Sequence, residues 1–372
     1  MKIVLVGPYP PPIGGISIHI QRAAGHLRQH GWDCDIYDES SGSNRPEGVY
    51  PIHSYTSFIM RFPWLQGDLF HFHSISRSFR IMLGLFKMFG KKIMLTAHGD
   101  SLKRQIEQSN PASRFLFIRS LRMIDHIVCV NKADRDMLLS FGFRSNQVTA
   151  LPSFIKPIET EQHLLQIPRE VTDFMEAGEF TITANGCIRL DQGRDLYGAD
   201  LLVQLLQDLT VKGYKARILF ALLGSSEQSA EERRYYNELK ERLREWGLES
   251  RFYFYEVDQT ELYPLLRKSH LFVRPTLTDG FGVSIAEALA CGIPALASDV
   301  CRRPEGATLF KSGNADDLLE KVQDVMDNYS SRKQEILDLP IPDYMSELLM
   351  LYKRVMSKTR LDSNMVIGPD GK

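Results

Sequence analysis

The stretch from Leu271 to Gly306 reads LFVRPTLTDGFGVSIAEALACGIPALASDVCRRPEG. Its first residues, Leu271–Val273, form a short apolar run, which predicts a buried strand closed by Pro275. A loop of small and flexible residues follows and holds Asp279. A strand that leads into such a loop is typical of the ligand-binding edge of a parallel sheet.

A helix and a second strand complete this unit. Ser284 and Glu287 have the spacing of a capping box, and the residues up to Cys291 are strong helix formers. Gly292 and Pro294 end the helix, and another apolar strand follows. The helix N-terminus, with its unpaired amides and positive dipole end, then faces the carboxyl edge of the sheet. That is a place for an anionic ligand, most simply a phosphate.

Four pieces of this stretch occur in an order and spacing that resemble a known family. They are Asp279-Gly-Phe-Gly282, Glu287-Ala-Leu, Cys291-Gly-Ile-Pro294 and Ala297-Ser-Asp299. They resemble the donor-site segment of the family 4 glycosyltransferases, which are retaining enzymes of the two-domain GT-B type. The residues Arg302-Arg-Pro-Glu-Gly306 are similar to a subset of that family found in surface-polysaccharide assembly.

The resemblance implies roles for two acids eight positions apart, Asp279 and Glu287. Asp279 is expected on the donor sugar hydroxyls, although Glu is commoner there, and Glu287 on the nucleotide ribose. The plainer alternative is that Glu287 caps its own helix and Asp279 is a solvated loop acid. Both acids together in this setting favour a ligand site. The donor-binding residues expected in this stretch are Gly280, Phe281, Gly282, Val283, Ser284 and Glu287.

Length and composition indicate two globular domains. The chain has 372 residues, 43% of them hydrophobic and 24% charged, with no apolar run long enough to span a membrane. The opening residues Met1–Gly7 are too short for a secretory signal and predict a first buried strand. The five cysteines have no paired spacing for zinc or disulfides, which favours a reducing cytoplasm.

Charge divides unevenly along the chain. Residues 1–150 hold 18 Lys and Arg against 11 Asp and Glu, a net +7, so the remainder carries −8. This asymmetry suggests different partners for the two halves. Without a recognised nucleic-acid motif, nucleic acid is a weak candidate. Two basic amphipathic segments, residues 76–92 and 112–125, could lie on an anionic membrane or merely cover the sheet.

Polar residues follow several predicted strands of the first half. Gly14 and Gly15 come after the first strand, where the resemblance places donor binding and a tight turn is the alternative. No G-x-G-x-x-G or Walker pattern supports a dinucleotide or ATP site. His98-Gly99 ends a later strand, and the resemblance implies a catalytic position for His98 near the anomeric carbon. His98 and His73 could equally be hydrogen-bonded structural residues at strand ends.

The second half departs from the family at one cation. The family has an Arg and a Lys that bind the diphosphate, but this chain has Tyr197 where the Lys is expected. Arg189 or Arg194 could still neutralise the leaving phosphate, because guanidinium pairs well with phosphate oxygens.

Alternating strands and helices in two halves predict an α/β fold of the GT-B type, with two doubly wound Rossmann-like domains facing a cleft. The expected bounds are 1–157 for the acceptor-side domain, 158–175 for a linker, 176–335 for the nucleotide-sugar domain, 336–358 for a helix crossing back to the first domain, and 359–372 for a disordered tail.

These features predict a retaining glycosyltransferase that moves a sugar from a nucleotide-sugar to a glycan or lipid-linked acceptor in polysaccharide biosynthesis. No cofactor or metal is expected, and the location is cytoplasmic, with a possible peripheral contact to the inner face of the membrane. Two alternatives stay open. One is a related GT-B synthase or epimerase, and the other is a non-catalytic subunit that binds a nucleotide or partner.

Overall fold

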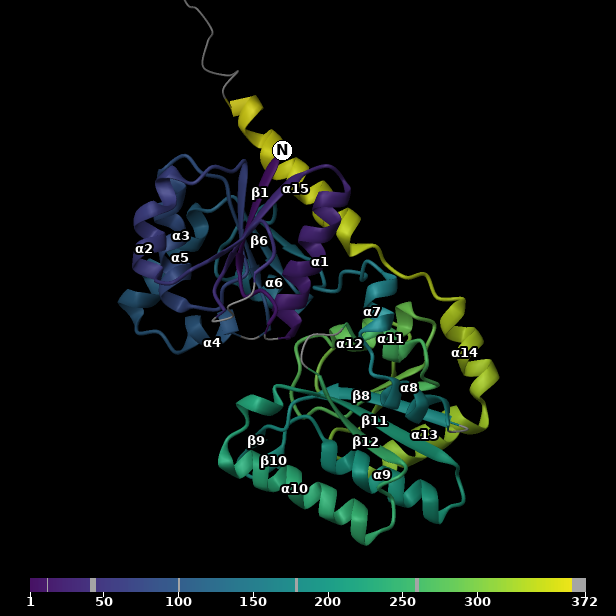
Figure 1. Ribbon diagram of the computed structural model, residues 1–372. Helices are drawn as coiled ribbons and strands as arrows, with labels where there is room; N and C mark the ends of the chain where they lie inside the picture. The colour runs from purple at the N-terminus through teal and green to yellow at the C-terminus, as the bar shows by residue number, and fades with distance from the viewer. Residues whose placement is uncertain (12, 41–44, 100, 178–179, 258–260, 363–372) are drawn as a thin grey trace, which may run out of the picture. The chain divides into compact units, whose positions relative to one another are not determined.

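A computed structural model of the chain describes residues 1–11, 13–40, 45–99, 101–177, 180–257 and 261–362 (Figure 1). The chain divides into two compact units. The first contains Met1–Ile155 together with the segment that starts at Asp343, and the second is Lys156–Pro342. Each unit is built on its own parallel sheet.

The first unit has a seven-stranded sheet with all neighbours parallel. In spatial order its strands are β3 (Val49–Pro51), β2 (Asp33–Asp38), β1 (Lys2–Gly7), β4 (Leu69–Phe72), β5 (Ile93–Ala97), β6 (His126–Cys129) and β7 (Val148–Ala150). The order turns outward on both sides of β1 and β4, as in a doubly wound fold. The central strands are buried on both faces, which explains their nearly continuous apolar sequences.

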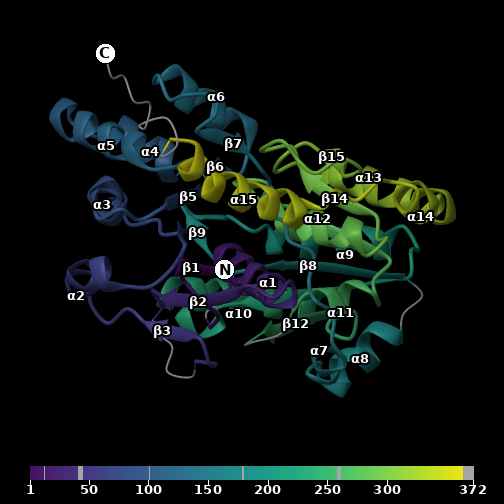
Figure 2. The ribbon, with the colours of Figure 1, turned by 90° about the horizontal axis from the view of Figure 1, so that it is seen from above.

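Helices cover both faces of this sheet (Figure 2). One face packs against α2, α3, α4, α5 and α6 through a core rich in phenylalanine, and the other packs against α1 and α15. The bounds of these elements are α1 (Gly15–Gln29), α2 (Tyr55–Arg61), η1 (Phe62–Trp64), α3 (Arg77–Met88), α4 (Ser101–Glu107), α5 (Pro111–Met123), α6 (Lys132–Ser140) and α15 (Tyr344–Asp362).

The C-terminal helix α15 belongs to the first unit although it follows the whole second unit in sequence. Its residue Tyr352 is fully buried and its hydroxyl lies 2.7 Å from Nδ1 of His71 on β4. This helix starts at Tyr344 rather than at residue 336, because residues 338–343 leave helical geometry. It also continues to Asp362, so the tail predicted from residue 359 begins too early, and residues 363–372 lie outside the described residues.

The second unit has a six-stranded parallel sheet. In spatial order its strands are β12 (Phe252–Val257), β11 (Ala216–Leu223), β8 (Phe180–Gly186), β13 (Leu271–Arg274), β14 (Ala295–Ser298) and β15 (Thr308–Phe310). Its helices are α7 (Glu161–Leu165), α8 (Arg169–Glu176), α9 (Ala199–Val211), η2 (Ser225–Glu227), α10 (Ala230–Glu245), α11 (Tyr263–Leu266), α12 (Val283–Ala290), α13 (Ala315–Asp327) and α14 (Tyr329–Leu337). The prediction of two Rossmann-like domains is therefore confirmed.

The predicted linker over 158–175 is wrong, because this segment folds onto the second unit. It contains α7 and α8, and the Tyr263 hydroxyl contacts both the amide and the carbonyl of Thr160. Val171 and Met175 are buried against the second unit. The one proline of the segment, Pro168, is the N-cap of α8 and separates α8 from α7 instead of marking an open connection.

The predicted basic face on residues 76–92 is also wrong in part. Arg80 is fully buried, and its guanidinium bonds Ser74, Ser101 and Gln105. Lys87 pairs with Asp125 at 2.6 Å, and the ammonium groups of Lys91 and Lys92 bond backbone carbonyls. No helix of the described residues combines the length and apolarity needed to cross a membrane.

Candidate functional site

Helix α12 begins at the carboxyl edge of the second sheet, directly after the loop that follows β13. Its N-cap is Gly282, with φ +87° and no side-chain cap. The predicted capping box is wrong, because Ser284 lies inside the first turn rather than at the N-cap. The first amides of α12, at Val283 and Ser284, therefore keep their hydrogen-bonding capacity for another acceptor.

Gly282 is required by its surroundings as well as by its backbone. A Cβ at this position would lie 2.5 Å from Cδ1 of Ile285 and 3.0 Å from Nη1 of Arg303. The left-handed φ is itself unfavourable for residues with a side chain. The glycine thus lets the loop approach both α12 and Arg303 closely.

Asp279 is held between two arginines from different parts of the second unit. Its Oδ2 accepts from Nε of Arg274 at 2.8 Å and from Nη1 of Arg303 at 2.7 Å. Its Oδ1 accepts from the amide of Gly280 at 2.9 Å. The solvated-acid alternative for Asp279 is therefore wrong, since the carboxylate is a partly buried member of an ion cluster, with 13% of its side chain exposed. We call it the Arg-Asp-Arg cluster (Arg274, Asp279, Arg303).

Arg303 joins three segments around the N-terminus of α12. Its Nε bonds the carbonyl of Ser298 at the end of β14, while Nη2 bonds the hydroxyls of Thr276 and Ser298. Only 1% of its side chain is exposed. Arg274, at the end of β13, bonds Asn185 at the end of β8 as well as Asp279. The cluster thereby ties together the ends of three neighbouring strands.

Electrostatics keep Asp279 ionised. Burial alone would raise the pKa of this carboxyl, but the charges and hydrogen bonds of Arg274 and Arg303 outweigh it and lower the pKa. One carboxylate between two guanidinium groups leaves a net positive charge beside the first amides of α12. This is an environment suited to an anion with several oxygens.

Glu287 lies on α12 and is 3% exposed. It is therefore buried in the second unit, five residues after the N-cap of the helix that follows Asp279, and a shared site for the two acids stays a prediction. The ribose contact of Glu287 and the sugar contact of Asp279 stay predictions. Gly280 and Phe281 lie in the loop between Asp279 and the helix.

The predicted phosphate cations differ in their placement. Arg189 pairs with Glu232 at 3.4 Å and is electrostatically coupled to Tyr197 and Cys187. Arg194 lies exposed on the antiparallel hairpin of β9 (Leu190–Asp191) and β10 (Arg194–Asp195). Arg274 lies with its guanidinium carbon 5.7 Å from the centre of the Tyr197 ring. A cation therefore stands beside the tyrosine that replaces the family lysine, but it comes from β13.

In the first unit, Gly14 and Gly15 begin α1. The amide of Gly14 donates to Oγ of Ser17 at 2.9 Å, and Gly14 has an extended φ of −161°. A Cβ at Gly15 would find no atom within 4 Å. Neither glycine has the left-handed φ of Gly282, and open space remains beside Gly15. Donor binding by this pair and the tight-turn alternative both stay predictions.

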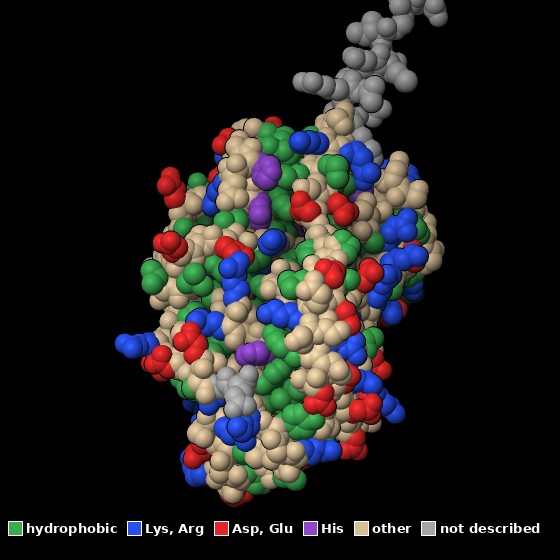
Figure 3. Space-filling model, turned by 90° about the vertical axis from the view of Figure 1, so that its right-hand side faces the viewer, with side chains coloured by type: hydrophobic (Ala, Val, Ile, Leu, Met, Phe, Trp, Pro, Cys, Tyr) green, Lys and Arg blue, Asp and Glu red, His purple; other side chains and the backbone are tan. Residues whose placement is uncertain are grey.

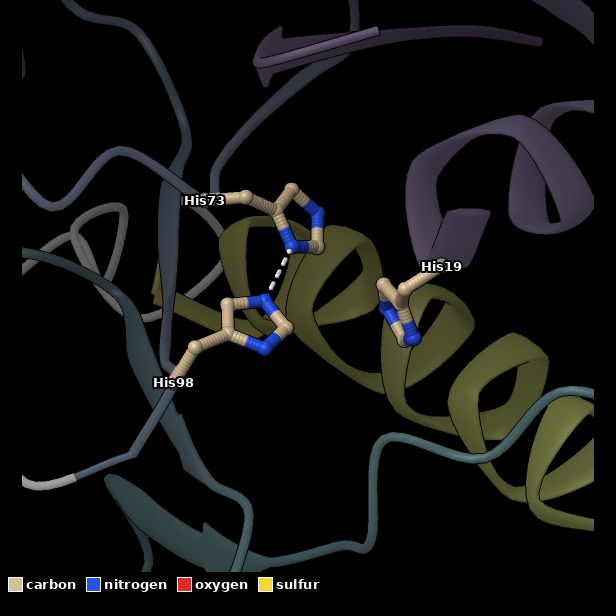
Figure 4. Close-up of side chains that lie close together, drawn as sticks. All are labelled: His19, His73 and His98. Atoms are coloured by element: carbon tan, nitrogen blue, oxygen red, sulfur yellow. Dashed lines mark hydrogen bonds between the residues drawn. The ribbon is translucent and has the colours of Figure 1, made fainter. Parts of the chain in front are cut away.

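Histidines gather at the carboxyl edge of the first sheet (Figure 4). His98 follows β5 and its Nε2 lies 3.0 Å from Nδ1 of His73, which follows β4. His19 on α1 lies beside both. Burial is the main cause that lowers the pKa of all three, to about 4 for His19, so the imidazoles are neutral at physiological pH.

Sequence reasoning missed Arg274, Arg303 and His19. Arg303 was within reach, because it belongs to the Arg-Arg-Pro-Glu-Gly segment already noted. Arg274 precedes Pro275 in a strand that reads as apolar, and His19 lies in an unremarkable helix. The ring neighbours of His19 are far away along the chain, so the sequence offered no signal for it. Arg274 lies only five positions before Asp279, and its distant partner is Asn185.

Two family descriptions match the chain, one in each half. Residues 13–157 match Glycosyltransferase Family 4, and residues 189–328 match Glycosyl transferases group 1. Together they include the histidines of the first sheet edge and the Arg-Asp-Arg cluster of the second.

Individual relatives are distant. The gpi3 subunit of phosphatidylinositol N-acetylglucosaminyltransferase from Schizosaccharomyces pombe is 22% identical over 215 residues, which are 56% of this chain and 42% of that subunit. The chain thus spans less than half of that relative. An uncharacterized glycosyltransferase of Methanocaldococcus jannaschii is 23% identical over 90% of both chains. Among solved structures, HepE of Anabaena in complex with UDP has a TM-score of 0.68 at 14% identity, covering 96% of this chain and all of that one.

Proposed function

We propose that this chain, which belongs to the family 4 glycosyltransferases and has the GT-B fold, transfers a sugar from a nucleotide-sugar to a hydroxyl with retention of configuration. The acceptor in this proposal is a glycan or a lipid-linked glycan of a surface polysaccharide. The observation that carries it is the uncapped start of α12 beside the Arg-Asp-Arg cluster. HepE in complex with UDP and with UDP-glucose supports a nucleoside diphosphate sugar as the donor class.

The donor diphosphate binds at the start of α12 in this proposal. The amides of Val283 and Ser284 donate to its oxygens, and the positive end of the helix dipole stabilises its charge. Arg274 supplies the cation that the family takes from the lysine replaced by Tyr197. Arg189 is the second candidate cation. No metal ion is needed for the leaving group, because helix and guanidinium groups supply the positive charge.

The sugar and ribose contact the two acids. Asp279 is fixed by its arginines and keeps lone-pair capacity for a sugar hydroxyl, while Glu287 binds the ribose hydroxyls. The bond between the anomeric carbon and the diphosphate oxygen breaks as the acceptor oxygen bonds the same face of that carbon. The acceptor proton passes to the departing diphosphate. His98 is the proposed catalytic contribution of the first unit, which it would make as a neutral imidazole.

Ligand binding tests the donor site before any acceptor is known. Purified chain is screened by thermal shift against UDP, GDP, dTDP, CDP and their common sugars, with and without EDTA. One nucleotide should stabilise the chain, by about 2.7 kcal/mol at a concentration 100 times its dissociation constant, whether or not EDTA is present. Glu287→Gln should weaken stabilisation by the nucleotide and by its sugar conjugate, and Asp279→Asn should weaken the part of the stabilisation that the sugar adds, whereas the exposed Arg302→Ala should keep both. Stabilisation that survives both acid variants would show that the donor site lies elsewhere.

A non-catalytic subunit is the second candidate, because Tyr197 stands where the family has a diphosphate-binding lysine. Such a subunit would bind a nucleotide or a partner without turnover. Hydrolysis of the bound nucleotide-sugar, followed over hours by release of free sugar, separates the two. A wild-type rate above that of Asp279→Asn supports the enzyme, and equal rates support the subunit.

Peripheral membrane contact is the remaining part of the proposal. Apolar side chains are exposed on two neighbouring helices of the first unit, with Met88 71% exposed on α3 and Phe115 and Leu116 63% and 57% exposed on α5. The exposed cations Lys103 and Arg119 lie on α4 and α5. On the face shown in Figure 3, by contrast, Lys and Arg are interspersed with Asp and Glu. A cytoplasmic protein with this surface could bind the anionic inner face of the cell membrane.

Liposome flotation tests this surface. Phe115→Ser combined with Leu116→Ser should reduce binding to vesicles containing anionic lipid, because exposed apolar area and charge both drive interfacial binding. Leu165→Ser on α7 is a matched control, since Leu165 is 85% exposed and lies in the second unit. Equal flotation of the double variant and the control would remove the membrane contact from the proposal.

A further inference from the structure

The three histidines at the edge of the first sheet form a nearly equilateral group. The ring centroids lie 5.1 Å apart for His19 and His73 and 5.3 Å apart for each of the other two pairs. One ring nitrogen from each residue lies within 4.8 Å of the others, and the side chains are buried (Figure 4). Within the described residues, this is the one group of His, Cys, Asp or Glu side chains with such spacing.

Hydrogen bonding fixes which nitrogen of His19 is available. Its Nδ1 lies 2.7 Å from the carbonyl oxygen of Ser153, which can only accept, so Nδ1 carries the proton and Nε2 bears the lone pair. Nε2 of His19 and Nε2 of His73 are both buried without a hydrogen-bond partner among the described residues. Each such orphaned atom costs about 1–3 kcal/mol. A carbonyl that orients the opposite nitrogen is also the usual support of a metal-ligating imidazole.

A neighbouring histidine shows what a satisfied structural residue looks like in the same place. His71 lies with its ring 4.1 Å from that of His73, but its Nδ1 lies 2.7 Å from the hydroxyl of Tyr352 and its Nε2 2.7 Å from the hydroxyl of Thr96. Both of its nitrogens are therefore occupied. In the trio, by contrast, Nδ1 of His73 bonds Nε2 of His98, while Nε2 of His19 and Nε2 of His73 have no partner among the described residues. The trio therefore has unused coordination capacity at two nitrogens, and an ion that takes Nε2 of His98 as its third ligand replaces the hydrogen bond between His73 and His98.

We propose that His19, His73 and His98 form a binding site for a divalent transition-metal ion, with Zn²⁺ as the first candidate. Three neutral imidazoles suit zinc, cobalt, nickel or copper, whereas Mg²⁺ and Ca²⁺ prefer oxygen ligands. Arg22 and Arg80 exert positive charge on His19 and His98, so the site should be weaker than a structural zinc site.

An ion at this site would occupy the imidazole of His98, the residue proposed to act in transfer. The ion is therefore an inhibitor rather than a cofactor, and EDTA should restore activity lost to added Zn²⁺. This consequence rests on the proposed function, but binding of the ion does not. The binding experiment and the activity experiment can consequently fail independently.

The test uses EDTA-treated full chain without a polyhistidine tag. Co²⁺ is titrated while the visible absorption of tetrahedral cobalt is followed, and Zn²⁺ is then added as a competitor. One ion per chain should bind. Loss of an outer-sphere partner of a metal ligand already weakens binding about 10- to 100-fold, so His19→Gln, His73→Gln and His98→Gln should each cost at least that much. His71→Gln should retain the site.

Circular dichroism and thermal unfolding establish that each variant is folded. His19→Gln is the most informative variant, because Nε2 of His19 has no hydrogen-bond partner among the described residues that the substitution would remove. Absence of the cobalt spectrum from folded wild-type chain overturns the proposal. Unchanged affinity in folded His19→Gln overturns it equally, because the ion would then be held by other groups.

Discussion

The carboxyl edges of the two sheets have the same backbone architecture but differ in the charge of the side chains that they hold. The first edge gathers neutral imidazoles, because burial is the main cause that lowers the pKa of His73 and His98. The second gathers full charges, because Arg274 and Arg303 surround Asp279 and lower its pKa despite burial. A parallel sheet therefore fixes where ligands can bind, while the partners of each side chain decide which charge is held there.

Removal of Arg303 should disrupt the Arg-Asp-Arg cluster and cause the largest loss of unfolding free energy among these variants. Arg303→Ala leaves Asp279 buried with one arginine and removes the bonds to Ser298 and Thr276, so we expect a loss of about 3–5 kcal/mol of unfolding free energy in the second unit. Hydrogen exchange of peptides from each unit measures this loss separately. Arg302→Ala, an exposed neighbour, is the control and should change little. A loss confined to the first unit would contradict this assignment of Arg303.

Glu39 should show the opposite pH behaviour to a paired carboxylate. Burial raises its pKa from 4.5 to about 7. Between these values the unfolded chain loses the proton while the folded chain keeps it, so stability falls by about 3 kcal/mol as pH rises from 4.5 to 7. Glu39→Gln should remove this decline. The measurement is the difference in unfolding free energy between wild type and variant at pH 4.5 and pH 8.

The difference in unfolding free energy between wild type and Glu39→Gln reports on Glu39 alone, because the other titrating groups contribute equally to both proteins. His19, with a pKa lowered to about 4, makes stability rise with pH up to its ordinary value of 6.5, and this trend is present in both proteins. Asp195 in the second unit, with a pKa raised to about 6, likewise contributes to both. A difference that does not vary with pH would show that Glu39 titrates as an exposed carboxyl.

Alanine substitution of the glycine at each helix start should have different effects on unfolding free energy, moderate at Gly282 and small at Gly15. Gly282→Ala places a Cβ at a left-handed φ and 2.5 Å from Ile285, so we expect a loss of about 1–3 kcal/mol and weaker nucleotide binding. Gly15→Ala has space and should be near neutral in stability. Urea unfolding and calorimetric titration of the nucleotide measure the two consequences. Equal destabilisation by both variants would argue against a special backbone at Gly282.

Substitution of Arg189 should have the smallest effect on stability, and it tests whether this side chain binds the diphosphate or only pairs with Glu232. Its pair with Glu232 is long, at 3.4 Å, and 52% of the Arg189 side chain is exposed. Arg189→Ala should therefore change unfolding free energy by less than about 1 kcal/mol. If Arg189 neutralises the diphosphate, nucleotide affinity should nevertheless fall. Unchanged affinity would leave Arg274 as the cation beside Tyr197.

Sequence reasoning reached the strands and the donor-side helix because their signals are local. The apolar run at Leu271–Val273 lies in the observed β13, and the break at Gly292 comes directly after the end of α12. Helix starts were harder, as at Ser284, because a capping-box spacing can fall inside a first turn when a glycine provides the cap. The basic segment 76–92 predicted a solvent-exposed position for Arg80, but this side chain is buried. The sequence pattern does not show its hydrogen-bond partners, which come from other elements.

The sequence by itself determined two parallel-sheet halves and a family-like donor segment, since periodicity, turn residues and motif spacing all act over short distances. Only the tertiary structure decided which charges meet. Arg303 reaches Asp279 across 24 positions, and His19 joins His73 and His98 from a different element. The energy of a charge or an imidazole depends on its burial and on its partners. Those partners become neighbours only when the sheet brings its strand ends to one edge.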